Sequence, residues 1–325
     1  VWRQADKYGV PKMAFINKLD RVGADFLGTV DMMRTRLKAN PIILQLPISQ
    51  GDNFTDIIDL IEMKQLRWDE ESLGTIYYFE DIADEYRKEA EEHREKIIEA
   101  AAEYDDDIME AYLSEASVDS RKILEAIRKA TVSLELVPVL CGSALRNKGI
   151  QPLLDAIVEF LPSPVDVPPI QGTHPESGEI VECQAKDSDP LAALIFKVAM
   201  IEGRKLSFLR VYSGKMKVGE ELYNPSLKKK EKLTRILQMH ANKREEIEEL
   251  RAGDIAAVVG LKTVQTGDTI CDEDKPVILE RIDFPEPVLS LAVEPKTKAD
   301  QQKLGMALAK LAQEDPTFRV VTDPE

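Results

Sequence analysis

Cysteine and histidine are scarce in this chain, which has three of each among its 325 residues. The cysteines, at positions 141, 183 and 271, are odd in number and far apart, and the histidines are equally isolated. This pattern predicts neither a disulfide framework nor a metal centre, and it favours a reducing, cytoplasmic setting. Long apolar runs are also lacking and no signal segment is visible, so no membrane partner is expected.

The sequence also lacks a phosphate-binding loop, because no segment matches the pattern G-x-x-x-x-G-K-[ST]. In nucleotide-hydrolysing proteins the backbone amides and the lysine of that loop hold the phosphates, and its hydroxyl holds Mg²⁺. No magnesium ligand and no catalytic residue are therefore predicted in this chain. The first residue is not methionine, and residues 1–8 resemble the end of a helix closed by Gly9, so we expect a fragment cut at both ends.

An excess of basic charge is absent too, since the formal net charge of -16 argues against a DNA-binding protein. The acidic excess is concentrated in residues 69–135, which contain 21 acidic and 8 basic side chains. Two interpretations of this segment stay open. It is either a solvated acidic face, as charge runs commonly are, or a docking surface for a basic partner protein.

A polar tetrad, Asn17-Lys18-Leu19-Asp20, follows an apolar run and has the chemistry of a guanine-reading site. The carboxylate of Asp20 can accept two hydrogen bonds at once, and guanine offers a matching pair of donors on N1 and N2, which adenine does not. The amide of Asn17 can hold the base edge and a neighbouring loop, while the aliphatic stem of Lys18 can cover the base or the ribose. The tetrad alone is a weak signal, because a polar turn after a strand would look the same.

A second loop, Cys141-Gly142-Ser143-Ala144, strengthens the guanine interpretation. Its small residues would allow close approach, and the backbone N–H groups of Ser143 and Ala144 are predicted to donate to the guanine O6. Both loops follow predicted strands, at 12–16 and 136–140, and a helix is predicted over 150–160. Open α/β sheets bind nucleotides at the carboxyl ends of their strands. The two loops together therefore predict a site for the guanine of GTP or GDP, made of Asn17, Lys18, Asp20, Ser143 and Ala144.

The rest of the sequence predicts further helices, a linker and strands. Helical periodicity in the acidic segment predicts helices over 83–102, 107–113 and 121–131, and the proline-rich stretch 161–169 predicts an interdomain linker. Short β runs separated by glycine turns then predict a closed barrel, with strands at 191–200, 207–212, 220–223, 232–240, 254–259 and 269–271. The last segment predicts a β-α-β unit, with strands at 288–293 and 318–321 and a helix at 298–313.

These segments together resemble the elongation factor G family of translational GTPases, which drive translocation on the ribosome, and the resemblance covers essentially the whole chain. Part of it rests on Asn17–Arg21, Gly23–Phe26, the Cys141–Ala144 loop with Asn147–Gly149, and the linker Leu161–Pro164. The segments that match the family more specifically lie beyond the linker, at Met239–Glu246, Ala252–Ile255, Glu294–Thr297 and Glu314–Phe318.

The resemblance implies an α/β and β multidomain fold in three parts. Residues 1–165 would be the C-terminal half of a P-loop-type G domain, with a helical inserted subdomain at about 42–135. Residues 166–283 would be the β-barrel domain II, and residues 284–325 the start of an α+β, ferredoxin-like domain III. The family's guanine contacts map onto the five residues named above, and Leu19 stands where the family usually has a methionine that does not read the base.

The resemblance also implies partners. In this family the acidic insert faces the stalk protein of the large ribosomal subunit, so we expect a monomer that binds the ribosome through that protein. The basic run Lys228-Lys229-Lys230 is a candidate contact for ribosomal RNA, although a lysine cluster in a loop is more often only solvated. The parent would hydrolyse GTP with Mg²⁺ and a positioned water, whereas this chain alone is expected to be inactive and to bind GDP weakly.

Three other interpretations stay open. A related ribosomal GTPase, either a release factor of the third class or a tetracycline-resistance ribosome-protection protein, shares the domain order. A non-catalytic ribosome-docking module would need no phosphate loop. An unrelated nucleotide-dependent enzyme would share only the tetrad.

Overall fold

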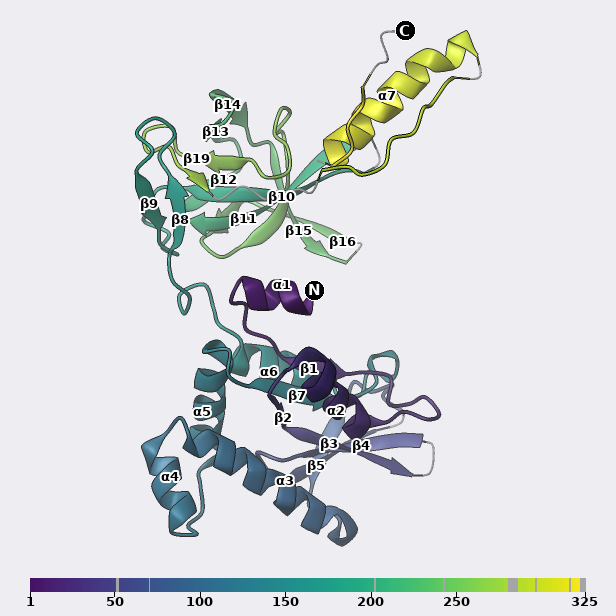
Figure 1. The fold of residues 1–325 in the computed structure, drawn as a ribbon, viewed down its shortest axis with the longest axis vertical. Coiled ribbons are helices and arrows are strands. Elements are labelled where there is room, and N and C mark those ends of the chain that lie inside the picture. Colours follow the sequence, from purple (N-terminus) through teal and green to yellow (C-terminus); the bar gives the residue numbers. More distant parts are fainter. Residues whose placement is uncertain are drawn as a thin grey trace. The chain divides into compact units, whose positions relative to one another are not determined.

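A computed structural model describes residues 1–50, 53–69, 71–201, 203–241, 243–279, 286–295, 297–315 and 317–321 (Figure 1). The chain divides into two compact units, Val1–Pro162 and Ser163–Glu325, each of which is described by itself. Within the described ranges, no helix is both long and apolar enough to cross a membrane.

The first unit is built on a three-stranded parallel sheet with the order β1-β7-β2. Its strands are β1 (Ala14–Ile16), β7 (Val137–Cys141) and β2 (Pro41–Ile43), and β7 is buried along its whole length, as expected for the central strand of a parallel sheet. Helices α1 (Trp2–Lys7), α2 (Phe26–Leu37) and α6 (Ile150–Phe160) complete this part. The predicted strands at 12–16 and 136–140 and the helix at 150–160 are confirmed.

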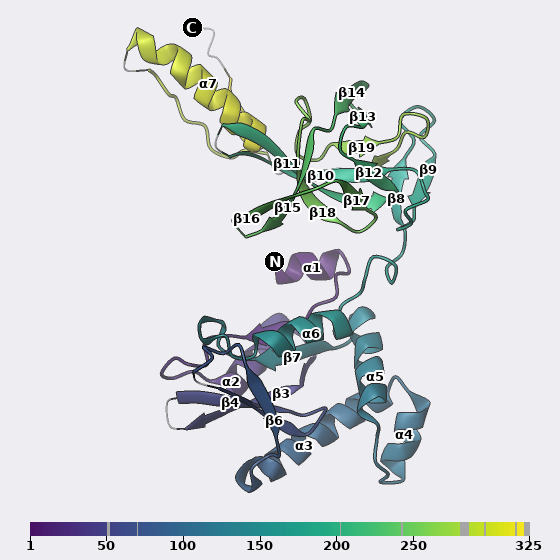
Figure 2. The ribbon, with the colours of Figure 1, turned by 180° about the vertical axis from the view of Figure 1, so that it is seen from behind.

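An insertion lies between β2 and β7, and its first half is a four-stranded antiparallel sheet with the order β3-β4-β5-β6. The strands are β3 (Gln45–Gln50), β4 (Asn53–Asp59), β5 (Lys64–Trp68) and β6 (Tyr77–Glu80). The sequence analysis described the insert as helical and missed this sheet. Figures 1 and 2 show it alongside α3, and both elements contribute to one hydrophobic core.

The second half of the insertion is helical, as predicted. It contains α3 (Asp84–Ala102), α4 (Asp106–Leu113) and α5 (Ser120–Val132), which begin and end within one residue of the predicted bounds. Asp105 and Asp119 cap α4 and α5 by accepting hydrogen bonds from backbone amides of the first turn. Each helix buries an isoleucine completely, at Ile97, Ile108 and Ile123.

The second unit contains an eight-stranded antiparallel sheet with the order β14-β13-β19-β10-β11-β18-β15-β16. The strands are β10 (Ala192–Ile201), β11 (Arg204–Ser213), β13 (Glu221–Asn224), β14 (Lys229–Lys232), β15 (Arg235–His240), β16 (Lys243–Ile247), β18 (Ile255–Val259) and β19 (Thr269–Cys271). The sheet curls around one apolar cluster, to which β12 (Lys215–Lys217) and β17 (Glu249–Arg251), paired with each other, also contribute. The arrangement is barrel-like, and all six predicted strand regions contain strands.

A smaller sheet and one helix complete the second unit. The sheet has the order β20-β8-β9, formed by β20 (Ile278–Leu279), β8 (Ile170–Thr173) and β9 (Ile180–Cys183). Residues 161–169 form neither helix nor strand. The helix is α7 (Lys298–Glu314), which confirms the helix predicted at 298–313.

The two strands predicted beside α7, at 288–293 and 318–321, are wrong. The chain forms no strand in either segment, and Val288 and Leu289 are 95% and 82% exposed. A strand is stabilised by hydrogen bonds to a neighbouring strand, and neither segment has such a neighbour in the part of the chain that the structure describes. An apolar run alone therefore does not make a strand here.

Candidate guanine-recognition site

The two predicted loops lie side by side because the strands that precede them are neighbours. In the parallel pair β1 and β7, Ile16 is opposite Cys141, so both strands end at the same edge of the sheet. Two backbone hydrogen bonds then join the loops, from the Gly142 N–H to the Ile16 carbonyl at 3.1 Å and from the Leu19 N–H to the Gly142 carbonyl at 3.3 Å. Residues far apart in the sequence thus form one surface.

Asp20 and Ser143 form the main side-chain contact between the loops. The Ser143 hydroxyl donates to Asp20 Oδ1 at 2.7 Å, and Ser143 is completely buried. Arg146 Nε lies 3.9 Å from Asp20 Oδ2. The hydrogen bond from Ser143, followed by smaller effects that include the charges of Arg146 and Arg21, holds the pKa of Asp20 below its ordinary value although burial opposes this. Asp20 is therefore an ionised carboxylate that only accepts hydrogen bonds at neutral pH.

Asn17 holds both loops through one oxygen. Its Oδ1 accepts from the Lys18 N–H at 2.7 Å and from the Ala144 N–H at 2.9 Å. The prediction that this amide holds the neighbouring loop is confirmed. The Nδ2 group of Asn17 has no acceptor among the described residues and can donate to a ligand. Lys18 has a φ of 67° and an exposed side chain, so the backbone turns sharply between Asn17 and Asp20.

The backbone N–H groups of Ser143 and Ala144 already have acceptors in this structure. Ser143 donates to the Lys148 carbonyl at 3.0 Å, and Ala144 donates to Asn17 as described. Their predicted contact with the guanine O6 stays a prediction, and it would require a change of acceptor. Leu145, which the sequence analysis did not consider, is 88% exposed, and its N–H has no acceptor within the described ranges. Leu145 lies in the 3₁₀ helix Ala144–Arg146, and the first N–H groups of a helix have no acceptor within it.

Two glycines allow the second loop to fold tightly. A Cβ at Gly142 would lie 2.4 Å from the Lys148 carbonyl oxygen and 2.8 Å from the Phe15 ring. Gly149 has a φ of 84°, and a Cβ there would lie 2.5 Å from the Cys141 carbonyl oxygen. Larger residues at these positions would separate the loop from the end of β7.

The inserted sheet supports the same loop from its other side. Lys148 Nζ donates to the Thr55 carbonyl on β4 at 3.0 Å, and Gln151 Nε2 donates to the Gly74 carbonyl, between β5 and β6, at 2.8 Å. A Cβ at Gly74 would lie 2.5 Å from the Arg146 carbonyl oxygen. The insertion therefore contacts the guanine loop directly, which the sequence analysis did not predict.

The described residues contain no group of three or more histidine, cysteine or acidic side chains that could hold a metal ion. The absence of a magnesium ligand stays a prediction, because Mg²⁺ beside a nucleotide is bound by one or two protein groups together with the phosphates. In the basic run, Lys228 lies 3.9 Å from Glu176, and Lys230 is paired with Glu273. On α3, by contrast, the side chains of Glu91, Glu92 and Glu95 are exposed.

Comparisons with known proteins identify a family for three parts of the chain. Three family models match it: "Elongation factor Tu GTP binding domain" over residues 1–163, "Elongation factor Tu domain 2" over 205–271, and "Elongation Factor G, domain III" over 284–325. Elongation factor G 2 from Syntrophus aciditrophicus (strain SB) is 54% identical over all 325 residues, which correspond to 48% of that protein.

A solved structure supports the same relationship. A crystal structure of a protein from Thermus thermophilus matches with a TM-score of 0.80 and 27% identity, covering 100% of this chain and 46% of that one. The chain thus spans about half the length of these two relatives. With a GTP-binding domain model over half of its length and a full-length match to elongation factor G 2, the chain belongs to the elongation factor G family of translational GTPases.

Proposed function

We propose that this chain is a guanine-recognising and ribosome-facing part of a translocation factor that hydrolyses GTP on the ribosome in the cytoplasm. Its parts would be a partial G domain at 1–165 with the insertion at about 42–135, domain II at 166–283, and the start of domain III at 284–325. The identity of 54% to an elongation factor G favours this family over the related ribosomal GTPases. GTP hydrolysis would require a longer parent protein, because this sequence holds no phosphate-binding loop.

The contact between Ser143 and Asp20 carries the guanine proposal. The 2.7 Å hydrogen bond fixes one carboxylate oxygen of Asp20 and keeps the group ionised. The carboxylate would accept from guanine N1 and N2, and Asn17 Nδ2 would donate to N7. Lys18 would cover the base with its aliphatic stem, and the N–H groups of Ala144 and Leu145 would face O6.

The test measures the affinity of the chain itself for three nucleosides by ligand-observed NMR. Guanosine offers both donors, inosine lacks the N2 amino group, and adenosine lacks the donor pair. We expect affinity to fall in that order, by about tenfold or more for each lost hydrogen bond to the carboxylate.

Asp20→Asn should remove the preference for guanosine over inosine, because the amide would face the N2 donor with a donor of its own. Asp31→Asn is the matched control, since Asp31 is an exposed carboxylate on α2 that pairs with Arg34. Equal affinity for all three nucleosides would reject the site. Tight GDP binding in calorimetry would contradict the assignment of the phosphate contacts to the missing loop.

We also propose that the acidic insert docks on the stalk protein of the large ribosomal subunit. The supporting observation is the run of exposed carboxylates on α3, in a segment with 21 acidic and 8 basic residues. Opposite charges on the two partners would accelerate their association at low salt. Contact of the basic run Lys228–Lys230 with ribosomal RNA stays a further prediction.

The docking proposal is tested by measuring the association rate with purified stalk protein. Neutralising Glu91, Glu92 and Glu95 to glutamine should slow association at low salt and have little effect at high salt. The control changes three exposed carboxylates of the second unit, Glu179, Glu182 and Glu221. An unchanged rate in the α3 variant, or an equal reduction in the control, would reject this docking surface.

A further inference from the structure

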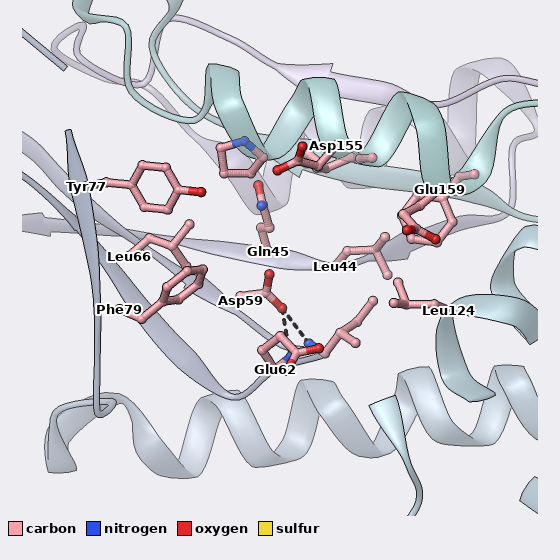
Figure 3. Close-up of a pocket in the computed structure, with 15 residues that line it drawn as sticks. Leu44, Gln45, Asp59, Glu62, Leu66, Tyr77, Phe79, Leu124, Asp155 and Glu159 are labelled. Atoms are coloured by element: carbon pink, nitrogen blue, oxygen red, sulfur yellow. Dashed lines mark hydrogen bonds between the residues drawn. The ribbon is translucent and has the colours of Figure 1, made fainter. Parts of the chain in front are cut away.

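A pocket of about 160 Å³ lies in the first unit, between the inserted sheet and the helices α5 and α6 (Figure 3). Leucine and phenylalanine side chains form much of its wall, and its polar lining comes from Gln45, Asp59, Glu62, Tyr77, Asp155 and Glu159. None of these residues belongs to the guanine site. We call this hollow the acidic pocket.

The acidic pocket is negatively charged, because four of its lining residues are carboxylic acids and none is lysine, arginine or histidine. Two arginines partly compensate from outside the lining. Arg121 Nη1 lies 3.3 Å from Glu159 Oε2, and Arg94 donates to the backbone carbonyls of Leu60 and Ile61. Asp155 has no ionic partner among the described residues and lies at the exposed side of the pocket.

Asp59 is a partly buried hydrogen-bond acceptor that can accept more hydrogen bonds than it does. Its Oδ1 accepts from the N–H groups of Ile61 and Glu62, both at 2.9 Å, and Oδ2 has no donor within the described ranges. Burial raises the pKa of Asp59 above its ordinary value. Burial, followed by the charges of Asp155 and Asp59, also raises the pKa of Tyr77. A positive charge placed among these groups would relieve the repulsion between them.

Gln45 supplies an independent indication that the acidic pocket takes a ligand. It is only 2% exposed, and its carboxamide oxygen accepts from the Cys141 N–H at 3.3 Å. The amide nitrogen of the same group has no acceptor in the described part of the chain. Figure 3 shows this carboxamide directed into the pocket, between Tyr77 and Asp155. Gln45 lines the pocket, and its nitrogen is not one of the fully buried polar atoms that lack a partner. The nitrogen therefore faces the open space of the pocket, where a ligand oxygen would accept its hydrogen bond.

We propose that the acidic pocket binds one alkylguanidinium or alkylammonium group that carries an oxygen acceptor nearby, as an arginine or lysine residue does. The cation would lie between Asp59 and Asp155, its methylene groups against the apolar wall, and a carbonyl oxygen at the amide nitrogen of Gln45. The volume is suitable, since a cavity of roughly 150 Å³ holds a group of the size of benzene. This proposal does not depend on guanine binding.

Three probes test the proposal by ligand-observed NMR with the full chain. Nα-acetyl-arginine methylamide carries the cation and the acceptor, agmatine carries cations without the carbonyl, and Nα-acetyl-citrulline methylamide is the neutral isostere. We expect the arginine compound to bind at least about tenfold more tightly than the citrulline compound, because of these two only the arginine compound carries a positive charge that pairs with the carboxylates. Equal binding of these two, or no binding of any cation, would overturn the proposal.

Agmatine tests the part of the proposal that concerns Gln45. Tighter binding of the capped arginine than of agmatine would support a basic residue of a protein as the ligand, because only the capped arginine offers a carbonyl oxygen to the amide nitrogen of Gln45. Equal or tighter binding of agmatine would overturn the oxygen acceptor and with it the proposal as stated.

The variant Asp155→Asn tests whether the arginine compound binds in the acidic pocket. Asp155 is exposed on α6, so the variant should fold, and it should weaken binding of the arginine compound by about tenfold. Glu99→Gln removes the same charge from an exposed position on α3, away from the pocket, and should leave binding unchanged. Unchanged affinity in Asp155→Asn would place any binding elsewhere and overturn the proposal.

Discussion

Replacing Ser143 by alanine should uncouple the two guanine loops. The substitution removes the hydroxyl that donates to Asp20 Oδ1 at 2.7 Å and changes little else, because Ser143 is buried and alanine is smaller. A hydrogen bond to a charged group typically contributes about 1.5–3 kcal/mol. The Asp20 side chain is 20% exposed, so water can replace part of the lost contact. We therefore expect a loss of about 1.5 kcal/mol, at the lower end of that range.

A double-mutant cycle isolates this contact from other effects. Ser143→Ala, Asp20→Ala and the double variant are each unfolded in urea, and the coupling free energy between the two changes is calculated. We expect a coupling of about 1 kcal/mol, since neighbours that share a hydrogen bond are not additive. Both tryptophans, Trp2 and Trp68, belong to the first unit, so tryptophan fluorescence follows the unfolding of that unit alone. A coupling within about 0.5 kcal/mol of zero would refute the reasoning.

The pH dependence provides a second check on the same contact. The pKa of Asp20 in the folded chain lies below its ordinary value, chiefly because of the bond from Ser143. The stabilisation is therefore complete above the ordinary pKa and is lost as pH falls through the lowered folded-state pKa. The coupling should be the same at pH 6 and pH 8, and a marked decrease between them would show that another group is responsible.

Three further outcomes are expected. Lys148→Met removes the bond to the Thr55 carbonyl and should accelerate hydrogen exchange in residues 143–149 by about 2- to 10-fold. Lys122→Met, at an exposed position of α5, should not. Gly305→Ala should increase the helicity of α7 in circular dichroism and stabilise the helix by about 0.5–1 kcal/mol, because alanine favours helix more than glycine does and the added Cβ would meet nothing within 4 Å. Reduced helicity would contradict this. Burial raises the pKa of the thiols of Cys141, Cys183 and Cys271, so a thiol reagent at pH 8 should react only after urea is added, and reaction of the native chain would be the contrary result.

The pairing of the guanine loops could be predicted from sequence because it depends on local signals. An apolar run that ends in Asn17-Lys18 and another that ends in Gly142-Ser143 each indicate a buried strand followed by a ligand loop. Neighbouring parallel strands then bring the loops together, as the register of Ile16 and Cys141 shows. The choice of acceptor for each backbone N–H could not be predicted, because it depends on ångström-scale positions of groups from both loops.

The inserted sheet could not be predicted for a different reason. Its strand β3 contains Pro47 and polar residues, so it lacks the simple alternation that identifies a strand. The strand exists because β4 pairs with it over its whole length. The reverse error occurred near Val288, where an apolar run predicted a strand but no neighbour is present in the described ranges. Pairing with neighbours decides both cases, and a single sequence does not contain it.

The strand order of the parallel sheet determines when its strands can pair while the chain is being synthesised. Within the described residues, β1 and β2 pair only with β7, which lies between them. The 93 residues between Ile43 and Val137 must be synthesised first, which takes roughly 5–20 s at typical rates of translation. During this delay neither strand can pair with β7, whereas β3 to β6 pair with successive neighbours and can begin to pair as they emerge. In the nascent chain, the sheet of the insertion can therefore form before β7 takes its place between β1 and β2.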